Sequence, residues 1–217
     1  MKSIMYKFII LSLIVLPFAS YAEGNFCDGF PEMSQSIIAS IEGKMSHVND
    51  TKEKSTTFFQ NKKAEISEMR YSDEVVKKVI SQNVATPKNF REKISKYTFE
   101  RHLNNMAETR HSEVLSAHKS YYEELESLIE KRTNIIESGL EDALEITKEA
   151  TFLSQDLCDS GEPESAKENF FVATTKVKQI LSDTILSVQD IKSKIVEAKG
   201  VRDTKIKAAF EKFDSAN

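Results

Sequence analysis

Two cysteines and four histidines are the side chains in this sequence best suited to redox or metal chemistry. Cys27 and Cys158 lie far apart in the chain, so they do not form the CxxC pair of a thiol oxidoreductase. No charge pattern around either cysteine would activate its thiol. Scarce cysteines in an even number are typical of a structural disulfide in an exported chain. We therefore predict a disulfide between Cys27 and Cys158.

The histidines do not form a metal-binding pattern. They are His47, His102, His111 and His118. On a helix, His111 and His118 would share a face but would be separated by about 10.5 Å along the axis, too far for one metal ion. No His, Cys or carboxylate spacing matches a zinc site. We expect no metal site and no cofactor.

The carboxylates and glycines also lack a catalytic pattern. Runs such as Glu123, Glu124 and Glu126, or Glu141, Asp142 and Glu145, are typical of solvated helix faces with oppositely charged partners one turn away. The six glycines are scattered, so no phosphate-binding loop appears. No GxSxG nucleophile turn is present. We therefore expect no catalytic residues and a protein that is not an enzyme.

The composition indicates which elements would position these side chains. Charged residues make up 29% of the chain, which contains only 6 Gly, 4 Pro and no Trp. A fold of many β-strands needs frequent turns, and this chain has too few turn-forming residues to supply them. Glu, Lys, Ser, Ile, Leu and Ala dominate instead. The sequence predicts an all-α protein of long helices.

Helix-breaking residues at three places divide the chain after residue 22. They include Pro31, Pro87 and Pro163, and each proline suits the first position of a helix. Thr86 is a suitable cap for the helix after Pro87. The predicted helices span about 32–85, 88–157 and 164–213.

Apolar side chains recur at helical spacing in each stretch. The third stretch has a heptad seam typical of coiled-coil packing. The second has a face wide enough to contact two neighbours. The seam comprises Thr174, Val177, Leu181, Thr184, Val188, Ile191, Ile195 and Ala198.

These faces predict an elongated antiparallel three-helix bundle, or coiled coil, formed by residues 23–217 as a single domain. The middle stretch is longer than its neighbours, so we predict a kinked helical hairpin at one end, at about residues 72–106. Cys27 precedes the first helix and Cys158 follows the second. In an antiparallel pair these positions meet, so the disulfide would tie that end of the bundle.

Aromatic side chains are the best candidates for partner contacts. The doublets Phe58-Phe59, Tyr121-Tyr122 and Phe170-Phe171 each place one ring on the core face, and the second is either a further core contact or an exposed anchor. The segment 204–213 is a short basic amphipathic helix that could touch a membrane surface or a partner groove, or could simply end the bundle. The candidate contacts are Phe59, Tyr122, Phe171, Phe210 and Phe213.

The first 22 residues have the pattern of a cleaved secretory signal peptide. Lys2 and Lys7 precede an apolar run over 8–18, and Ser20-Tyr21-Ala22 places small residues before a cut. The run is too short for a membrane span, so we expect no stable membrane anchor. The pattern looks bacterial, which indicates the periplasm, the cell surface or secretion.

Charge and architecture limit the classes of partner. The net charge is −4, and residues 1–22 contribute two lysines and no acidic residue, so the remaining chain is more acidic. Nucleic-acid binding is therefore not expected. We expect an exported protein that acts through protein–protein contacts in the bacterial envelope, with self-association through the heptad seam left open.

Two narrower functions are compatible with this outline. An exported chain of this size, with a three-helix bundle and a small appendage, resembles in architecture the VirB5-like minor pilins of type IV secretion. That resemblance implies a component of a secretion or conjugation apparatus. The alternative is a periplasmic chaperone or scaffold whose helices grip other envelope proteins.

Overall fold

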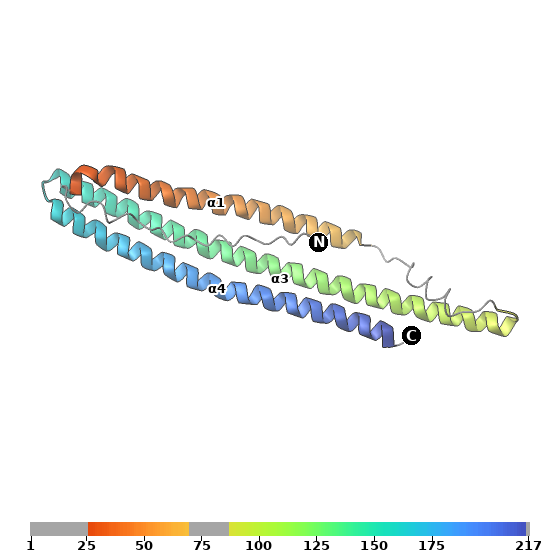
Figure 1. The fold of residues 1–217 in the computed structure, drawn as a ribbon. Coiled ribbons are helices and arrows are strands. Elements are labelled where there is room, and N and C mark those ends of the chain that lie inside the picture. The colour runs from red at the N-terminus through yellow and green to blue at the C-terminus, as the bar shows by residue number, and fades with distance from the viewer. Residues whose placement is uncertain (1–25, 70–86, 216–217) are drawn as a thin grey trace. The chain divides into compact units, whose positions relative to one another are not determined.

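The computed structural model describes residues 26–69 and 87–215, and these residues form three long α-helices (Figure 1). The helices are α1 (Phe26–Glu68), α3 (Phe90–Asp159) and α4 (Pro163–Ser215). No strand occurs in the part of the chain that the structure describes, so the predicted all-α class is confirmed. The predicted signal peptide over 1–22 and the predicted cap Thr86 lie outside these residues.

The turn between α3 and α4 forms where the sequence predicts it. Gly161 has a φ of 79°, a left-handed conformation that glycine adopts without steric cost. The backbone N–H of Gly161 donates to Cys158 O at 3.0 Å, and that of Glu162 donates to Leu157 O at 2.9 Å. This pair of bonds satisfies the last carbonyls of α3. Pro163 then opens α4, as predicted from its missing N–H.

Helix α1 begins earlier than predicted, because Pro31 lies inside the helix instead of opening it. A proline at this position removes one backbone hydrogen bond. The first turns are held by other contacts: Phe26 and Phe30 pack against Phe170, and Cys27 is bonded to Cys158. This burial and cross-link outweigh the local preference of proline.

Helix α3 begins at Phe90, and Asn89 is its cap. Asn89 Oδ1 accepts from the backbone N–H of Glu92 at 2.9 Å, while the Glu92 carboxylate accepts from the Asn89 amide and from the backbone N–H of Lys88. The bond to Asn89 Oδ1 satisfies one of the first N–H groups of the helix, and Glu92 in return satisfies two donors that precede it. α3 then continues to Asp159 without interruption.

The predicted hairpin over 72–106 falls partly outside the described residues. Residues 70–86 are among those not described, and residues 90–106 are the first turns of α3. Helix α1 ends at Glu68 and Met69 is not helical, so the predicted helix over 32–85 is confirmed only as far as Glu68 and is interrupted at Met69. The hairpin as a whole stays a prediction.

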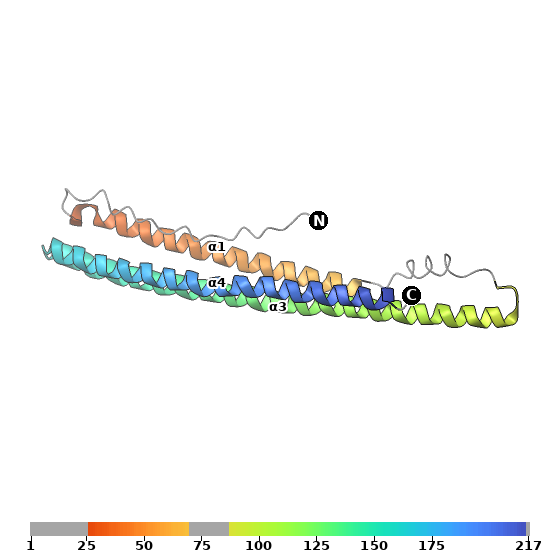
Figure 2. The same ribbon diagram turned by 60° about the horizontal axis from the view of Figure 1, so that its bottom comes forward.

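The chain separates into two compact units, and each contains a section of all three helices. Unit 1 comprises residues 26–52 and 131–191 among those described. Unit 2 comprises residues 53–69, 87–130 and 192–215. In each unit the three ribbons run alongside one another, and α3 and α4 run in opposite directions (Figures 1 and 2). The predicted antiparallel three-helix bundle is therefore confirmed.

The core of unit 1 is built from the predicted apolar faces. Ile37 and Ile41 of α1, Leu140 of α3, and Val177 and Leu181 of α4 are all buried in one cluster. Two ion pairs join α1 to α3 around this core: Lys52 to Glu137 at 3.0 Å and Lys148 to Glu42 at 2.9 Å. Both pairs are partly exposed, so they contribute little to stability compared with apolar burial.

Unit 2 has a smaller apolar cluster, formed by Leu103 and Ala107 of α3 and Phe213 of α4. Farther along the same helices, Ala117 and Ala198 are also buried. The predicted seam of the third stretch is confirmed across both units. Six of its eight residues are buried, and Val188 and Ile195 are half-buried.

Candidate functional site

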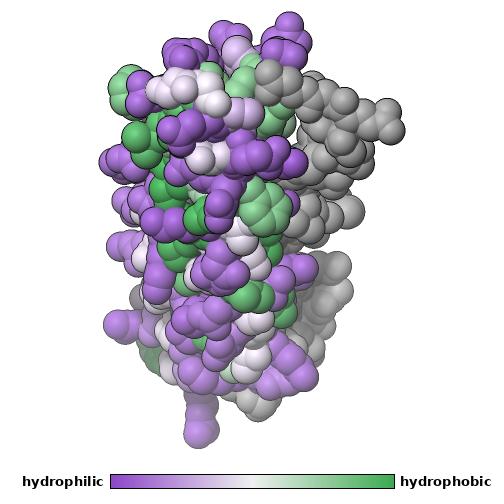
Figure 3. All heavy atoms as spheres, turned by 90° about the vertical axis from the view of Figure 1, so that its left-hand side faces the viewer, coloured by the Kyte–Doolittle hydropathy of each residue, from purple (hydrophilic) through white to green (hydrophobic). Residues whose placement is uncertain are grey.

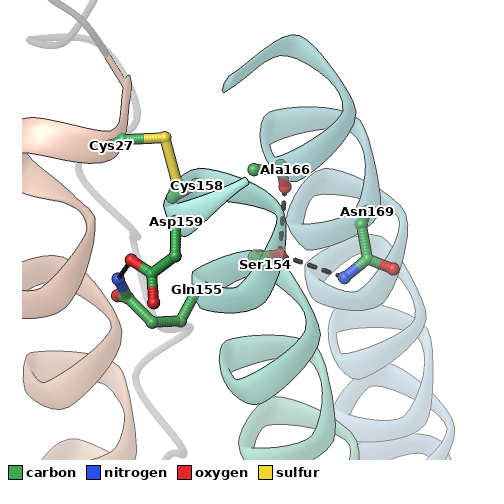
Figure 4. The surroundings of a disulfide bond; sticks show 7 residues. All are labelled: Cys27, Ser154, Gln155, Cys158, Asp159, Ala166 and Asn169. Carbon is green, nitrogen blue, oxygen red and sulfur yellow. Dashed lines mark hydrogen bonds between the residues drawn. A yellow bond between two sulfur atoms is a disulfide. The ribbon is translucent and has the colours of Figure 1, made fainter. Parts of the chain in front are cut away.

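The two cysteines form the disulfide that their positions predict. Cys27 near the start of α1 is bonded to Cys158 near the end of α3, with their Cα atoms 5.6 Å apart (Figure 4). Among the described residues no free cysteine remains. The bond ties the beginning of one helix to the end of the next in unit 1. It supplies cross-linking and leaves no thiol for chemistry.

A buried polar pair lies beside the disulfide. Ser154 of α3 is fully buried, and its hydroxyl donates to Ala166 O at 3.0 Å. The same oxygen accepts from Asn169 Nδ2 at 3.0 Å (Figure 4). Asn169 Nδ2 also lies 3.4 Å from Ala150 O. These bonds satisfy polar groups that would otherwise be costly to bury. They also set the register between α3 and α4.

Three aromatic rings close the same end of unit 1. Phe30 and Phe170 meet edge to face with ring centroids 5.0 Å apart, and Phe26 lies 5.1 Å from Phe30. Edge-to-face pairs at this distance stabilise a core beyond their area burial. Phe170 is therefore a core residue, as predicted for the first ring of its doublet. Its neighbour Phe171 is 61% exposed, as a partner contact requires.

Two of the five predicted partner contacts are wrong as surface positions. Phe59 is only 2% exposed and Phe213 only 4% exposed, so neither ring is available to a partner. Helix α1 is rotated so that Phe59, and not Phe58, faces inward. Phe213 completes the cluster with Leu103 and Ala107, so the end of α4 is a bundle helix. A one-residue shift turns a helix face by about 100°, and the sparse apolar pattern of this part of α1 did not define its phase.

The other three candidates keep some surface. Phe210 is 45% exposed, and Tyr122 is half-buried. Tyr122 belongs to a row of rings that crosses unit 2: Phe58 lies 5.2 Å from Phe59 and 6.4 Å from Tyr122, and Tyr122 lies 5.1 Å from Tyr121. The row ends at Arg202 of α4, whose guanidinium lies 4.4 Å from the Tyr121 ring centroid. These rings therefore join all three helices.

Cationic side chains lie over aromatic rings at two places in unit 2. Besides Arg202, the Arg110 guanidinium of α3 lies 4.0 Å from the Phe213 centroid and 5.1 Å from the Phe210 centroid. Lys212 forms an ion pair with Glu113 at 2.7 Å in the same region. These contacts hold the end of α4 against α3.

The environment around Arg202 changes the titration of two neighbours. Burial lowers the pKa of the His118 imidazole, and the positive charge of Arg202 lowers it further. Burial also raises the pKa of the Tyr121 hydroxyl. Both groups are only partly buried, and neither lies beside a nucleophile or a metal ligand set in the part of the chain described. The shifts reflect packing between helices.

The remaining histidines do not converge. His111 Nε2 lies 3.3 Å from Met69 O, where the end of α1 meets α3. No group of three or more His, Cys, Asp or Glu side chains within residues 26–69 and 87–213 has metal-binding geometry. Within the described residues, no helix combines the length and apolarity needed to cross a membrane.

Exposed apolar side chains form the surface feature that sequence reasoning identified least well. Phe152 and Leu153 of α3 are 74% and 51% exposed, and Phe171 and Val172 of α4 are both 61% exposed. We call these four the outer apolar residues. Because Asn169 bonds to Ala150 and Ser154, the four lie at one level of the α3–α4 pair. Seen from the side where these helices are joined, hydrophobic side chains reach the surface between hydrophilic ones (Figure 3).

The apolar residues near the end of α3 are spread over a wide face, so the sequence pattern did not show which of them are exposed. A face wide enough to contact two neighbours does not distinguish buried from exposed apolar residues at Phe152 and Leu153. Once Ser154 and Asn169 take the contact between α3 and α4, Leu153 turns outward. A helical wheel centred on Ser154 would have placed Phe152 about 160° away from it.

Comparison with known proteins does not assign this chain to a group. No protein family, no curated protein and no solved structure shows significant similarity to it.

Proposed function

We propose that this protein is exported across the cytoplasmic membrane of a bacterium and acts in the cell envelope by contact with other proteins. The outer apolar residues carry the proposal, since four large apolar side chains, each more than half exposed, lie at one level of the α3–α4 pair and offer anchors for a partner on its outer sides. The Cys27–Cys158 disulfide supports the exported location, because such bonds persist in oxidising compartments. The signal-like pattern over 1–22 supports it independently.

The disulfide gives this surface a fixed support. The bond, the Ser154–Asn169 pair and the Phe26–Phe30–Phe170 cluster all lie within a few turns of the outer apolar residues. A surface held on rigid helices loses little conformational entropy when a partner binds. This is an arrangement for recognition, and it requires no catalytic group.

Site-specific photocrosslinking in bacterial cells tests the proposal. A photoreactive amino acid replaces Phe152 or Phe171 in a tagged chain, and a matched chain carries it at Lys176, an exposed position on α4. We expect a discrete crosslinked species from the first two positions and not from the third. Equal crosslinking from all three, or none from any, contradicts a specific partner surface.

The identity of the crosslinked proteins separates the narrower functions. Recovery of pilus or secretion-channel subunits assigns the protein to a secretion apparatus, as the VirB5-like resemblance implies. A broad range of unfolded envelope proteins assigns it to the chaperones. A second copy of this chain identifies self-association.

A further inference from the structure

The first turns of α3 carry a row of apolar side chains that are exposed and do not belong to either core cluster described above. Phe90, Ile94 and Tyr97 are 78%, 52% and 66% exposed. Their spacing of four and three residues places them on one face of the helix. Between Phe90 and His102 only Lys96 and Glu100 are partly shielded, and every other side chain is exposed.

This row faces away from the core of unit 2. Leu103 and Ala107, the first buried residues of α3, are 1% and 0% exposed and pack with Phe213. At about 100° per residue, Leu103 lies about 150° and Ala107 about 110° around the helix from the mean direction of the row. The row is therefore not an extension of the bundle core.

Cationic side chains surround the row. The same helical geometry places Arg101 in line with Phe90 and Tyr97, with Lys93 on one side and Arg91 on the other. All three cationic residues are exposed. We call Phe90, Ile94 and Tyr97, together with these three cations, the basic aromatic face.

The acidic residues of the segment are directed elsewhere. Glu92 caps the helix by accepting from Asn89 and from the backbone of Lys88, on the side opposite to the row. Glu100 forms an ion pair with Lys96 at 3.8 Å. The face is thus locally cationic in a chain whose net charge is −4.

We propose that the basic aromatic face binds the surface of an anionic lipid bilayer. A helix that presents aromatic and aliphatic side chains between flanking Lys and Arg residues lies in the membrane plane. Its apolar row enters the headgroup boundary, and its cations meet lipid phosphates. Cations on both sides of the row match a flat anionic surface, which pairs with both sides at once. The contact is peripheral and reversible, and it is separate from the outer apolar residues.

Vesicle flotation tests this inference. The purified protein is mixed with vesicles of phosphatidylcholine alone, or with vesicles in which phosphatidylglycerol replaces part of it. We expect the protein to float with the anionic vesicles and to be released by salt, which screens the attraction. Each basic residue near an anionic surface strengthens partitioning about fivefold, so R91Q/K93Q/R101Q is expected to weaken it on the order of a hundredfold.

Two further variants separate the contribution of the apolar row to vesicle binding from nonspecific hydrophobic adsorption. F90S/Y97S should also abolish flotation with anionic vesicles, while F171S, which removes an equally exposed ring in unit 1, should leave it unchanged. All variants keep the same N-terminus, so residues 1–25 contribute equally to each. Circular dichroism should show equal helicity, because the changed side chains are exposed.

Three outcomes overturn the inference. Equal flotation with neutral and anionic vesicles would show that the cations play no role. If F171S lost as much flotation as F90S/Y97S, the binding would not be specific to this face. Absence of flotation with anionic vesicles rejects a lipid surface as the ligand. That result is also expected if the same face instead binds an acidic protein.

Discussion

Gly139 of α3 and Thr184 of α4 approach so closely that no side chain fits between them. A Cβ added at residue 139 would lie 3.1 Å from both Cβ and Cγ2 of Thr184, with Oγ1 closer still. Thr184 cannot easily turn away, because its hydroxyl donates to Ile180 O at 2.8 Å. This contact sets the separation of α3 and α4 towards the end of unit 1 that lies away from the turn between them.

Replacing Gly139 with alanine is therefore expected to destabilise the protein. Overpacking of a close helix contact costs about 1–3 kcal/mol, and the better helix propensity of alanine offsets up to about 1 kcal/mol. The free energy of unfolding, measured by urea titration, should fall in G139A. It should recover in part in G139A/T184A, which removes Oγ1 and Cγ2 of residue 184 but keeps its Cβ.

Gly43 provides the matched control for this test. It also lies inside a helix of unit 1, but a Cβ there would meet nothing within 4 Å. G43A should therefore stabilise the protein by up to about 1 kcal/mol through helix propensity alone. A loss of stability in G43A similar to that in G139A would refute the packing explanation.

Removal of the disulfide should lower stability strongly. The bond closes a loop with a sequence separation of 131, for which the chain-entropy treatment predicts a contribution of about 5 kcal/mol as an upper value. C27S/C158S should therefore unfold at a much lower temperature than the oxidised wild type. Adding reductant should lower the melting temperature of the wild type and leave that of the double variant unchanged. Alkylation followed by mass spectrometry should detect no free thiol in the exported protein.

Ser154→Ala should cost more stability than a serine substitution on the surface. The change leaves Ala166 O and the Asn169 amide with one hydrogen bond fewer in a buried environment, an effect of about 1–3 kcal/mol. Ser187 is the control, since its hydroxyl bonds only to Asp183 O at an exposed site. S187A should change the free energy of unfolding by about 0.5 kcal/mol or less. S154A and N169A should be less than additive, because they remove the same interaction.

Much of the fold could be predicted from the sequence, because each of the patterns involved has a single physical cause. The heptad seam of α4 predicted burial at Val177, Leu181 and Ala198 because apolar spacing alone decides which face packs. Pro163 predicted a helix start because its missing N–H is harmless only there. The disulfide followed from antiparallel topology and from the scarcity of cysteine.

The misassigned positions depend on tertiary contacts that leave no local signal. Pro31 lies within α1 because a disulfide and an aromatic cluster hold the first turns, and both depend on distant residues, Cys158 and Phe170. Phe59 was placed on the surface because few apolar neighbours define the phase of that part of α1. The exposed row at Phe90 escaped notice because a stripe of three apolar residues looks the same whether it is buried or not.

The last prediction concerns pH. Burial and the nearby Arg202 hold the pKa of His118 below its usual value of 6.5 in the folded protein, while Asp203 and Glu65 act in the opposite direction with smaller effect. At pH values between the folded and unfolded pKa, the unfolded chain therefore binds more protons than the folded one. The contribution of His118 to stability is complete above about pH 6.5 and is lost as the pH falls through the lower, folded pKa.

The variant H118Q keeps a neutral polar side chain at this position and should reduce the fall in unfolding free energy as the pH drops below about 6.5. Proton NMR of the imidazole gives a direct reading, since the His118 resonance should titrate below pH 6.5 in the folded protein. R202Q should move that midpoint upward, because it removes the neighbouring positive charge but leaves the burial. A midpoint unaffected by R202Q would show that burial alone sets the pKa of His118.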